Sequence, residues 1–286
     1  MGHEALDWSA LFTFASQTTA AVGGELLARQ DAIVAEVKGD GSLVTAADRW
    51  ADQALCEAIR AAFPDHGLLT EEGEQTAPDR DWVWVVDPID GTTNYSQGLP
   101  IWGISLALLH FGRPVLGYVH LPALNWVFQG LSWADQRLAT LNGRPLRPNP
   151  GPVDGHHLFS FCSRSLRLWR PAFPCKVRMV GAASYNLLSV AQGVCVGAVE
   201  ATPKVWDLAA VWVIAQAAGA AWVSLGDTDP FPLQAGRDYS QVSFPTLVVG
   251  RPEWVSVFKP WMDASPVALP FTQVEANLPQ TTATQT

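Results

Sequence analysis

Charged residues are scarce in this sequence of 286 residues: Asp, Glu, Lys and Arg together make up 16%, against 48% hydrophobic residues. Such a composition excludes an intrinsically disordered chain and predicts an extensive buried core. Positive charge is the scarcer sign, with 18 Lys and Arg against 27 Asp and Glu and a formal net charge of −9. This deficit argues against a nucleic-acid partner, because Lys and Arg neutralise the phosphates in such complexes.

Cysteine is also rare, and the spacing of the few cysteines excludes two kinds of site. The four cysteines are Cys56, Cys162, Cys175 and Cys195. They form no C-x-x-C pair of the kind found in zinc ribbons and redox sites, so we expect reduced and mostly buried thiols. His156 and His157 are adjacent in a region rich in Pro and Gly, where a solvated loop is expected and not a metal site. G-x-x-x-x-G-K-[ST], H-E-x-x-H and G-x-S-x-G motifs are absent.

No basic segment followed by an apolar run begins the sequence, so we expect no signal peptide and predict a cytoplasmic protein. One uncharged run, Leu208 to Leu225, has about the length of a membrane span. Alanine dominates this run, and Gln216, Gly219 and Ser224 interrupt it. A buried helix followed by a buried strand explains the run better, and no membrane partner is expected.

Apolar periodicity predicts helices over residues 6–29 and 45–62, with Thr45 as the N-cap of the second and Asp48 completing a capping box. The predicted strands cover 82–86, 101–111, 115–121, 125–129, 194–200, 220–225 and 246–250. Further helices are predicted at 208–218 and 252–259, where Pro260 ends the last one. The pattern predicts an α/β protein with a single domain over 1–265, divided into halves at 1–148 and 149–265, and a disordered tail at 266–286.

An acidic turn follows the apolar run Trp82–Val86 and reads Asp87-Pro88-Ile89-Asp90-Gly91-Thr92-Thr93. The two aspartates are three residues apart across a turn that proline stiffens, so both carboxylates and an intervening carbonyl can point at one place. Gly91 lets backbone N–H groups approach a phosphate closely. Mg²⁺ takes such hard oxygen ligands together with phosphate oxygens, although the same turn can also be purely structural.

The longer string from Trp84 to Tyr95, continuing through Gly98-Leu99-Pro100, resembles the signature of the inositol monophosphatase family. Three other segments resemble that family in the expected order, and with them the resemblance covers about 6–259. These segments are Lys38-Gly39-Asp40-Gly41-Ser42 with Val44, Thr45 and Asp48; Leu69-Thr70-Glu71-Glu72-Gly73; and Val205-Trp206-Asp207-Leu208-Ala209-Ala210. The resemblance implies a layered fold of the inositol monophosphatase and fructose-1,6-bisphosphatase type, with alternating helix and sheet layers, and a Mg²⁺-dependent phosphatase.

The resemblance also implies the ligands of two or more Mg²⁺ ions. Glu71, Asp87 and the Ile89 carbonyl would hold one ion, while Asp87, Asp90 and Asp207 would hold a second. Without cations, four carboxylates gathered in one place repel one another, and their pKa values rise.

The implied reaction is in-line attack of water on a phosphate monoester, without a covalent phosphoenzyme. Glu71 and the Thr92 hydroxyl would position the water, and Asp48 would accept a hydrogen bond from Thr92. Glu200 lies seven residues before Asp207, where the family places an acid that contacts substrate hydroxyls. The implied substrate-binding residues are Gly91, Thr92, Ala183 and Glu200.

The substrate stays open at this point. Inositol monophosphate is preferred, and histidinol phosphate, fructose 1,6-bisphosphate and a 3′-phosphoadenosine nucleotide are alternatives. Lys204 is either a contact for a second anionic group or an ordinary surface lysine. Thr70 and Val211 depart from the small residues common at their positions, and neither departure removes a ligand. A catalytically idle binding or assembly protein is the alternative from another class, and a homodimer is compatible with the sequence.

Overall fold

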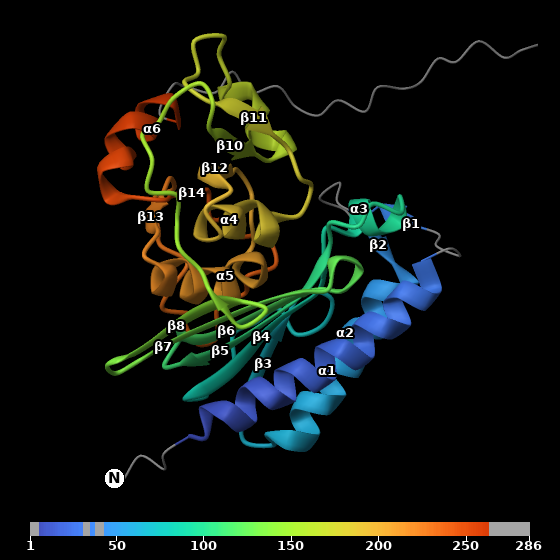
Figure 1. Ribbon diagram of the computed structural model, residues 1–286. Helices are drawn as coiled ribbons and strands as arrows, with labels where there is room; N and C mark the ends of the chain where they lie inside the picture. Colours follow the sequence, from blue (N-terminus) through green and yellow to red (C-terminus); the bar gives the residue numbers. More distant parts are fainter. Residues whose placement is uncertain (1–5, 31–34, 38–42, 263–286) are drawn as a thin grey trace, which may run out of the picture.

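Helices and sheets alternate in layers through the molecule (Figure 1). The structure is a computed structural model and describes residues 6–30, 35–37 and 43–262. Helices α1 (Trp8–Arg29) and α2 (Ala46–Ala62) cover one face of a seven-stranded sheet. The opposite face packs against α4 (Ala183–Ala191) and α5 (Val205–Ala218), and a five-stranded sheet lies beyond them. The predicted α/β fold with alternating helix and sheet layers is confirmed.

The two outer helices begin at side-chain caps. The Asp7 carboxylate accepts hydrogen bonds from the N–H groups of Ser9 and Ala10, at 3.0 and 3.1 Å. In α2 the predicted capping box is present: the Thr45 hydroxyl accepts from the Asp48 N–H, and the Asp48 carboxylate accepts from the Thr45 N–H at 2.7 Å. The box turns Asp48 inward, where only 1% of the residue is exposed.

The seven strands of the larger sheet follow one another in chain order. They are β3 (Gly67–Thr70), β4 (Trp82–Asp90), β5 (Gly103–His110), β6 (Arg113–Leu121), β7 (Trp126–Trp133), β8 (Gln136–Leu141) and β9 (Arg144–Pro145). Only β3 and β4 are parallel, with Thr70 opposite Val86. Since parallel strands end at the same edge, this register brings Glu71 beside Asp87.

Helix α5 lies almost directly on the backbone of this sheet. A Cβ atom at Gly117 in β6 would lie 2.3 Å from the Ala210 carbonyl oxygen, and one at Gly130 in β7 would lie 2.7 Å from Ile214 Cγ1. Because both layers cover it, α5 is apolar around most of its circumference. This explains the uncharged run from Leu208, and no helix in the described residues is long and apolar enough to cross a membrane.

The smaller sheet has the strand order β11-β10-β12-β14-β13. Its strands are β10 (Leu158–Phe161), β11 (Lys176–Arg178), β12 (Cys195–Glu200), β13 (Ala221–Ser224) and β14 (Thr246–Val249). Helix α6 (Val255–Met262) covers its outer face through an apolar cluster that includes Phe159, Phe161, Phe173 and Phe258. The central strand β12 therefore ends in the interior, and Glu200 is its last residue.

Several short elements complete the chain. They are β1 (Ala35–Val37), β2 (Leu43–Thr45), α3 (Thr92–Ser96) and the 3₁₀ helices η2 (Pro122–Leu124), η3 (Ser163–Leu168) and η4 (Pro252–Trp254). Strands β1 and β2 pair antiparallel. All four cysteines are free thiols, and only Cys162 is not fully buried.

The prediction for Pro260 is wrong. Pro260 lies inside α6, which continues to Met262. Its missing N–H costs only one bond near the helix end, and the Trp261 ring packs edge to face on Phe173 with centroids 5.2 Å apart. Residues 38–42, which belong to the first segment of the family resemblance, and the predicted tail at 266–286 lie outside the described residues. The larger sheet falls within 67–145 and the smaller within 158–249, and the division into halves at 148 stays a prediction.

Candidate active site

Three aspartates from two elements meet between the sheet layers. Asp87 and Asp90 end β4, and Asp207 lies in the first turn of α5. One carboxylate oxygen from each lies within 4.8 Å of the others. Asp87 is fully buried and Asp90 is 5% exposed. The cluster is thus the kind of site that can hold a metal ion.

A bulge at the end of β4 brings Asp87 and Asp90 to the same side. Residues three apart in a regular strand point to opposite faces of the sheet. Here Asp87 pairs with Ser105 and Asp90 with Gly103, so three steps on β4 match two on β5. The extra residue lets both carboxylates face the same side. Gly91 then turns the chain into α3 with a φ of 90°, a conformation that favours glycine.

The carboxylates shift one another's pKa values. Burial raises the pKa of Asp87 well above its usual range, and the charges of Glu71, Asp90 and Asp207 raise it further. Burial likewise raises the pKa of Asp207, with Asp90 and Glu71 adding to the effect. Asp87 Oδ2 is buried and has no hydrogen-bond partner within the described part of the chain. Burying an anionic oxygen without a hydrogen-bond partner is unfavourable unless a proton or a cation neutralises its charge.

Glu71 joins this group from the end of β3. Its N–H donates to the Val86 carbonyl at 3.1 Å, and the Gln75 side-chain amide donates to the Glu71 carbonyl at 2.5 Å. These two bonds fix the backbone of Glu71 next to Asp87. Its charge is among the causes of the raised pKa values of Asp87 and Asp207, so its carboxylate lies near the three aspartates without being one of the acids whose oxygens all lie within 4.8 Å of one another.

A hydrogen-bonded chain links α2 to α3 at the edge of the cluster. The Thr92 hydroxyl donates to Asp48 Oδ1 at 2.9 Å and also lies 3.1 Å from the Ile89 carbonyl oxygen. The other oxygen of Asp48 accepts from the Thr45 N–H and hydroxyl. The hydrogen bond that the resemblance implies between Asp48 and Thr92 is therefore present, and Ile89 turns its carbonyl toward the same place.

Asp90 also caps α4. Its carboxylate accepts hydrogen bonds from the N–H groups of Ala183 and Ser184, each at 2.8 Å, and from the Ser184 hydroxyl. An anion at a helix N-terminus is favoured by the helix dipole. Ala183 was predicted to bind substrate, and its N–H is bonded to Asp90. Sequence reasoning did not identify Ser184 as a partner of Asp90, because the two are 94 residues apart.

Glu200 is buried, not the exposed end of a strand. Only 7% of the residue is exposed, and Asn186 Nδ2 donates to Glu200 Oε1 at 2.5 Å. Burial raises the pKa of Glu200 to about 8, and the charge of Asp90 contributes to the rise. The nearby Cys162 thiol lowers the pKa of Glu200 against the larger effect of burial. Glu200 therefore lies near Asp90, and its partners Asn186 and Cys162 were not predicted.

Lys204 does not extend freely into solvent. Its Nζ donates to the Ser240 carbonyl at 2.8 Å, and its backbone N–H donates to Asp207 Oδ2 at 2.5 Å. Both bonds serve the fold: one ties the α5 N-terminus to the Ser240 segment, and the other orients Asp207. The ammonium is thus already engaged by a backbone carbonyl.

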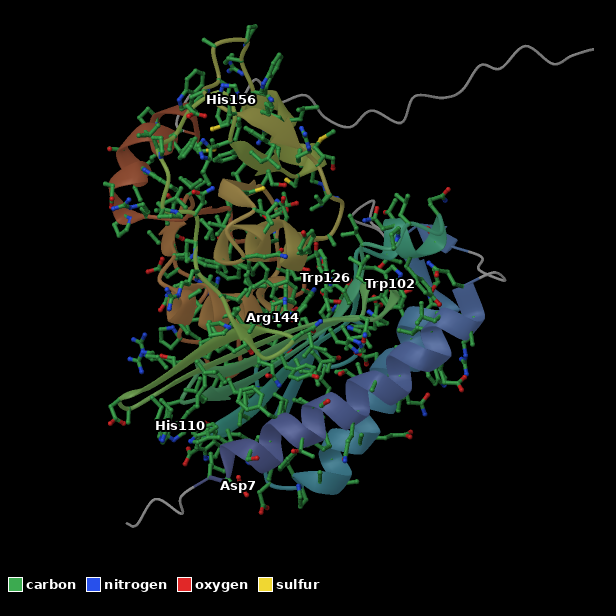
Figure 2. All side chains as sticks on the ribbon, in the orientation of Figure 1. Asp7, Trp102, His110, Trp126, Arg144 and His156 are labelled. Carbon is green, nitrogen blue, oxygen red and sulfur yellow. The ribbon has the colours of Figure 1, made fainter. Side chains whose placement is uncertain are left out.

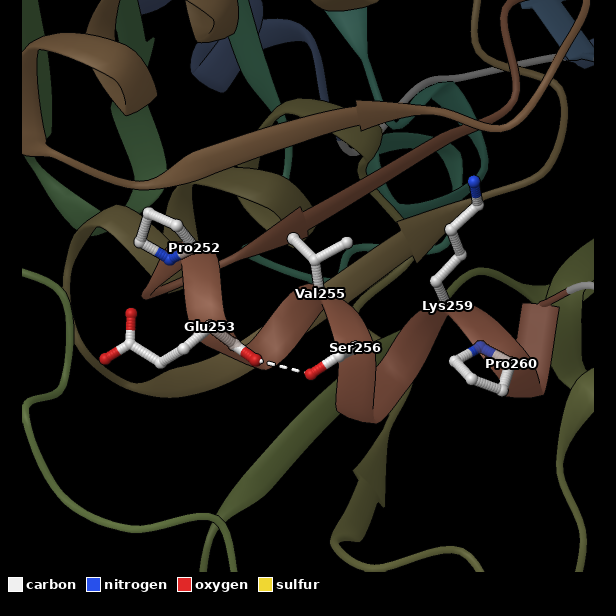
Figure 3. A pocket seen from close by; sticks show the side chains of 6 residues that line it. All are labelled: Pro252, Glu253, Val255, Ser256, Lys259 and Pro260. Atoms are coloured by element: carbon white, nitrogen blue, oxygen red, sulfur yellow. Dashed lines mark hydrogen bonds between the residues drawn. The ribbon is translucent and has the colours of Figure 1, made fainter.

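Two other regions that could attract a ligand lie away from the acids. Figure 2 shows His156 at the far end of the smaller sheet, where its N–H and the His157 ring both bond to Asp154. An open pocket of about 570 Å³ lies along η4 and α6 on the outer face of that sheet (Figure 3). Its lining residues are Pro252, Glu253, Val255, Ser256, Lys259 and Pro260. None of the predicted site residues lines it.

Comparison with known proteins identifies the family. A model described as the inositol monophosphatase family matches residues 7–244. The chain belongs to the inositol monophosphatase family. Its relatives include a protein named fructose-1,6-bisphosphatase/inositol-1-monophosphatase from Aquifex aeolicus, 31% identical over 204 residues, which are 67% of this chain and 76% of the relative. An inositol-1-monophosphatase from Synechocystis is 32% identical over 237 residues, 78% of this chain and 81% of the relative.

Not every relative in this inositol monophosphatase family has an enzyme name. A protein named Nus factor SuhB from Pasteurella multocida is 34% identical over 206 residues, 67% of this chain and 75% of that protein. Among solved structures, the Thermotoga maritima IMPase superposes with a TM-score of 0.75 at 27% identity, over 88% of this chain and 98% of the other. The family and fold that the Asp87 string indicated are therefore confirmed, and the family is one of phosphatases.

Proposed function

We propose that this chain hydrolyses a phosphate monoester of a small metabolite with the help of Mg²⁺, and that inositol monophosphate is its first candidate substrate. The observation that carries the proposal is the cluster of buried Asp87 and Asp90 with partly buried Asp207, in which one oxygen of Asp87 has no hydrogen-bond partner among the described residues. Buried carboxylates in this number destabilise a fold unless they neutralise a ligand's charge.

The donor set fits Mg²⁺. It consists of hard oxygen ligands, and the unpartnered Asp87 Oδ2 lacks a positive partner. Glu71, Asp87 and the Ile89 carbonyl would hold one ion, and Asp87, Asp90 and Asp207 a second. When bound, Mg²⁺ lowers the pKa of water and offsets charge on the phosphate oxygens.

The chain's own residues position the other reactants. Because the Thr92 hydroxyl donates a hydrogen bond to Asp48, a lone pair of Thr92 Oγ1 can accept a hydrogen bond from the attacking water. The Glu71 carboxylate would accept a second hydrogen bond from that water. Backbone N–H groups at Gly91 and Thr92 would bind the phosphate oxygens. The water oxygen bonds to phosphorus as the ester P–O bond opposite it breaks, and the alcohol leaves with a proton.

Buried Glu200 would bind a substrate hydroxyl, which suits a polyol or sugar phosphate. Fructose 1,6-bisphosphate is the alternative that the Aquifex relative's name supports. Histidinol phosphate and a 3′-phosphoadenosine nucleotide stay as further alternatives. The relatives named Nus factor support a non-enzymatic role, whereas the presence of every expected acid supports catalysis. A cytoplasmic location, a homodimer and the absence of a nucleic-acid partner remain predictions.

The test is phosphate release with and without Mg²⁺ on inositol 1-phosphate, histidinol phosphate, fructose 1,6-bisphosphate and 3′-phosphoadenosine 5′-phosphate. We expect release that requires Mg²⁺ and is fastest on inositol 1-phosphate. Asp90→Asn keeps the shape of a proposed metal ligand and removes its charge. We therefore expect this variant to lose nearly all turnover. Binding of Mg²⁺ without hydrolysis of any of the four substrates would favour the idle binding protein.

A further inference from the structure

One segment of this acidic protein contains basic residues and no acidic residues. Residues 155–199 contain no Asp or Glu, whereas the chain as a whole has 27. The Lys and Arg residues of this segment are Arg164, Arg167, Arg170, Lys176 and Arg178. All five are exposed, and none takes part in an ion pair within the described residues. The segment therefore presents unneutralised positive charge at the surface.

Arg164 is the member of this segment that lies beside the candidate site. It belongs to η3, directly after β10, and its Nη1 donates to Thr202 Oγ1 at 2.7 Å. Thr202 lies in the loop that leads from Glu200 to Asp207. The charge of Arg164 lowers the pKa of Glu200, against the larger effect of burial. The guanidinium thus lies at the rim of the place where Glu200 would meet substrate.

Two further bonds fix this arrangement. The Ala201 N–H donates to Cys162 Sγ at 3.3 Å, and the Cys162 N–H donates to the Val199 carbonyl at 3.2 Å. They join the start of η3 to the end of β12, so Arg164 is held near Glu200 by its own backbone. One of its five N–H donors is used by Thr202, and a planar guanidinium can offer two of the others to a phosphate.

We propose that Arg164 is a specificity-determining residue that binds a second phosphate of the substrate, remote from the one that is cleaved. The inference rests on the proposed function and applies to its bisphosphate alternative, a sugar or polyol that carries two phosphates. Arg164 fits this role better than Lys204, whose ammonium is already bonded to the Ser240 carbonyl. A substrate with a hydroxyl at Glu200 would direct its far end toward the guanidinium.

The experiment compares two ligands that differ only in the second phosphate, fructose 1-phosphate and fructose 1,6-bisphosphate. KM is measured from phosphate release, and Kd by calorimetry, for the wild type and Arg164→Gln. We expect the variant to raise KM and Kd for the bisphosphate about tenfold, the loss typical of one charge-assisted contact. Both constants for the monophosphate should stay within about twofold, and the wild type should prefer the bisphosphate.

Arg170→Gln is the matched control, because it removes the same charge from the same segment. Among the residues that the structure describes, the Arg170 guanidinium bonds only to the Arg167 and Trp169 carbonyls, so its loss should leave both ligands unaffected. An equal effect of the two variants, an equal effect on both ligands, or no preference of the wild type for the bisphosphate would overturn the proposal. If neither fructose phosphate is hydrolysed while inositol 1-phosphate is, the proposed function stands, and the calorimetric comparison alone decides the role of Arg164.

Discussion

At the residue scale, the Thr92 hydroxyl is the group whose position the surrounding structure controls most closely. It lies between Asp48 Oδ1 and the Ile89 carbonyl, so these two acceptors engage its proton and its lone pairs stay available to a water. Thr92→Val keeps the shape and removes the hydroxyl, and we expect kcat to fall about 10²-fold, as when one positioned catalytic hydrogen bond is lost. Steady-state phosphate release measures this.

Thr92→Ser is the control for that prediction, since it restores the hydroxyl without the methyl group. Its kcat should lie within about tenfold of the wild type, and KM should change little in either variant. Equal losses in the valine and serine variants would mean that the methyl packing, not the hydroxyl, matters.

Glu200 links the site to stability through its pKa. Burial raises that pKa to about 8 from an ordinary value of 4.5, so the folded chain keeps a proton that the unfolded chain has released. This contribution is complete below about 4.5 and is lost as the pH rises through about 8. Glu200→Gln keeps a neutral acceptor for Asn186 and removes the titration.

We therefore expect the melting temperature of the wild type to fall more steeply than that of Glu200→Gln between pH 7 and 9. A difference of about 1 kcal/mol would appear as about 2–4 °C. Calorimetric melting without Mg²⁺ is the measurement. Parallel melting curves across this interval would show that Glu200 is already ionised at neutral pH.

How far single residues could be predicted depended on their separation in the chain. Asp87 and Asp90 were found because both lie in one string of neighbouring residues, and Asp207 because a second string carries it. The Ser184 and Asn186 contacts bring together residues that are 94 and 14 apart, and no local pattern records them. The burial of Glu200 likewise depends on the layers packed around β12.

At the element scale, α2 holds both sides of the site with two buried acids one helical turn apart. Asp48 bonds to Thr92 of α3, and Asp52 faces the loop after β3, where the Thr70 hydroxyl lies 3.4 Å from Asp52 Oδ2 and the Glu72 N–H donates to the carboxylate. The same Thr70 hydroxyl accepts from the N–H groups of Gly73 and Glu74, at 2.9 and 3.1 Å. The loop that carries Glu71 is therefore held by α2.

Thr70→Val would leave these two N–H groups and Asp52 without their shared partner. Thr70 is 1% exposed, so we expect a loss of about 1–3 kcal/mol in unfolding free energy, the cost of unsatisfied buried groups. Displacement of Glu71 should also raise the Mg²⁺ concentration needed for half-maximal thermal stabilisation. Thr70→Ser, which keeps the hydroxyl, should behave like the wild type in both denaturant unfolding and Mg²⁺ titration.

Elements with strong patterns were predicted well, and weakly patterned ones were not. The capping box predicted the start of α2, and the apolar run at 82–86 predicted β4. Strands β8 and β9 were missed because they lie at the sheet edge, where half-exposed side chains give no clear alternation. The position of α5 on the sheet depends on Gly117 and Gly130, because a side chain at either position would clash with the helix. The sequence alone does not show this close approach.

At the scale of the whole molecule, the buried acids make stability depend on pH and cations together. Burial and mutual repulsion raise the pKa values of Asp87 and Asp207 above the ordinary 3.8. Without a cation, the contribution of these two aspartates to the unfolding free energy is therefore fully present below that pH and is lost as the pH rises through their folded pKa values. A bound divalent cation replaces the protons, so its stabilising effect should grow with pH.

We expect 5–10 mM Mg²⁺ to raise the melting temperature by about 5–10 °C at pH 8, corresponding to about 2.7 kcal/mol at a hundredfold excess over Kd. At pH 5.5 the shift should be clearly smaller, because protons compete for the same oxygens. Differential scanning calorimetry against NaCl of equal ionic strength separates binding from screening. Asp90→Asn should lose most of the shift at pH 8 and keep its dependence on NaCl. A shift of equal size at both pH values would place the cation away from these aspartates.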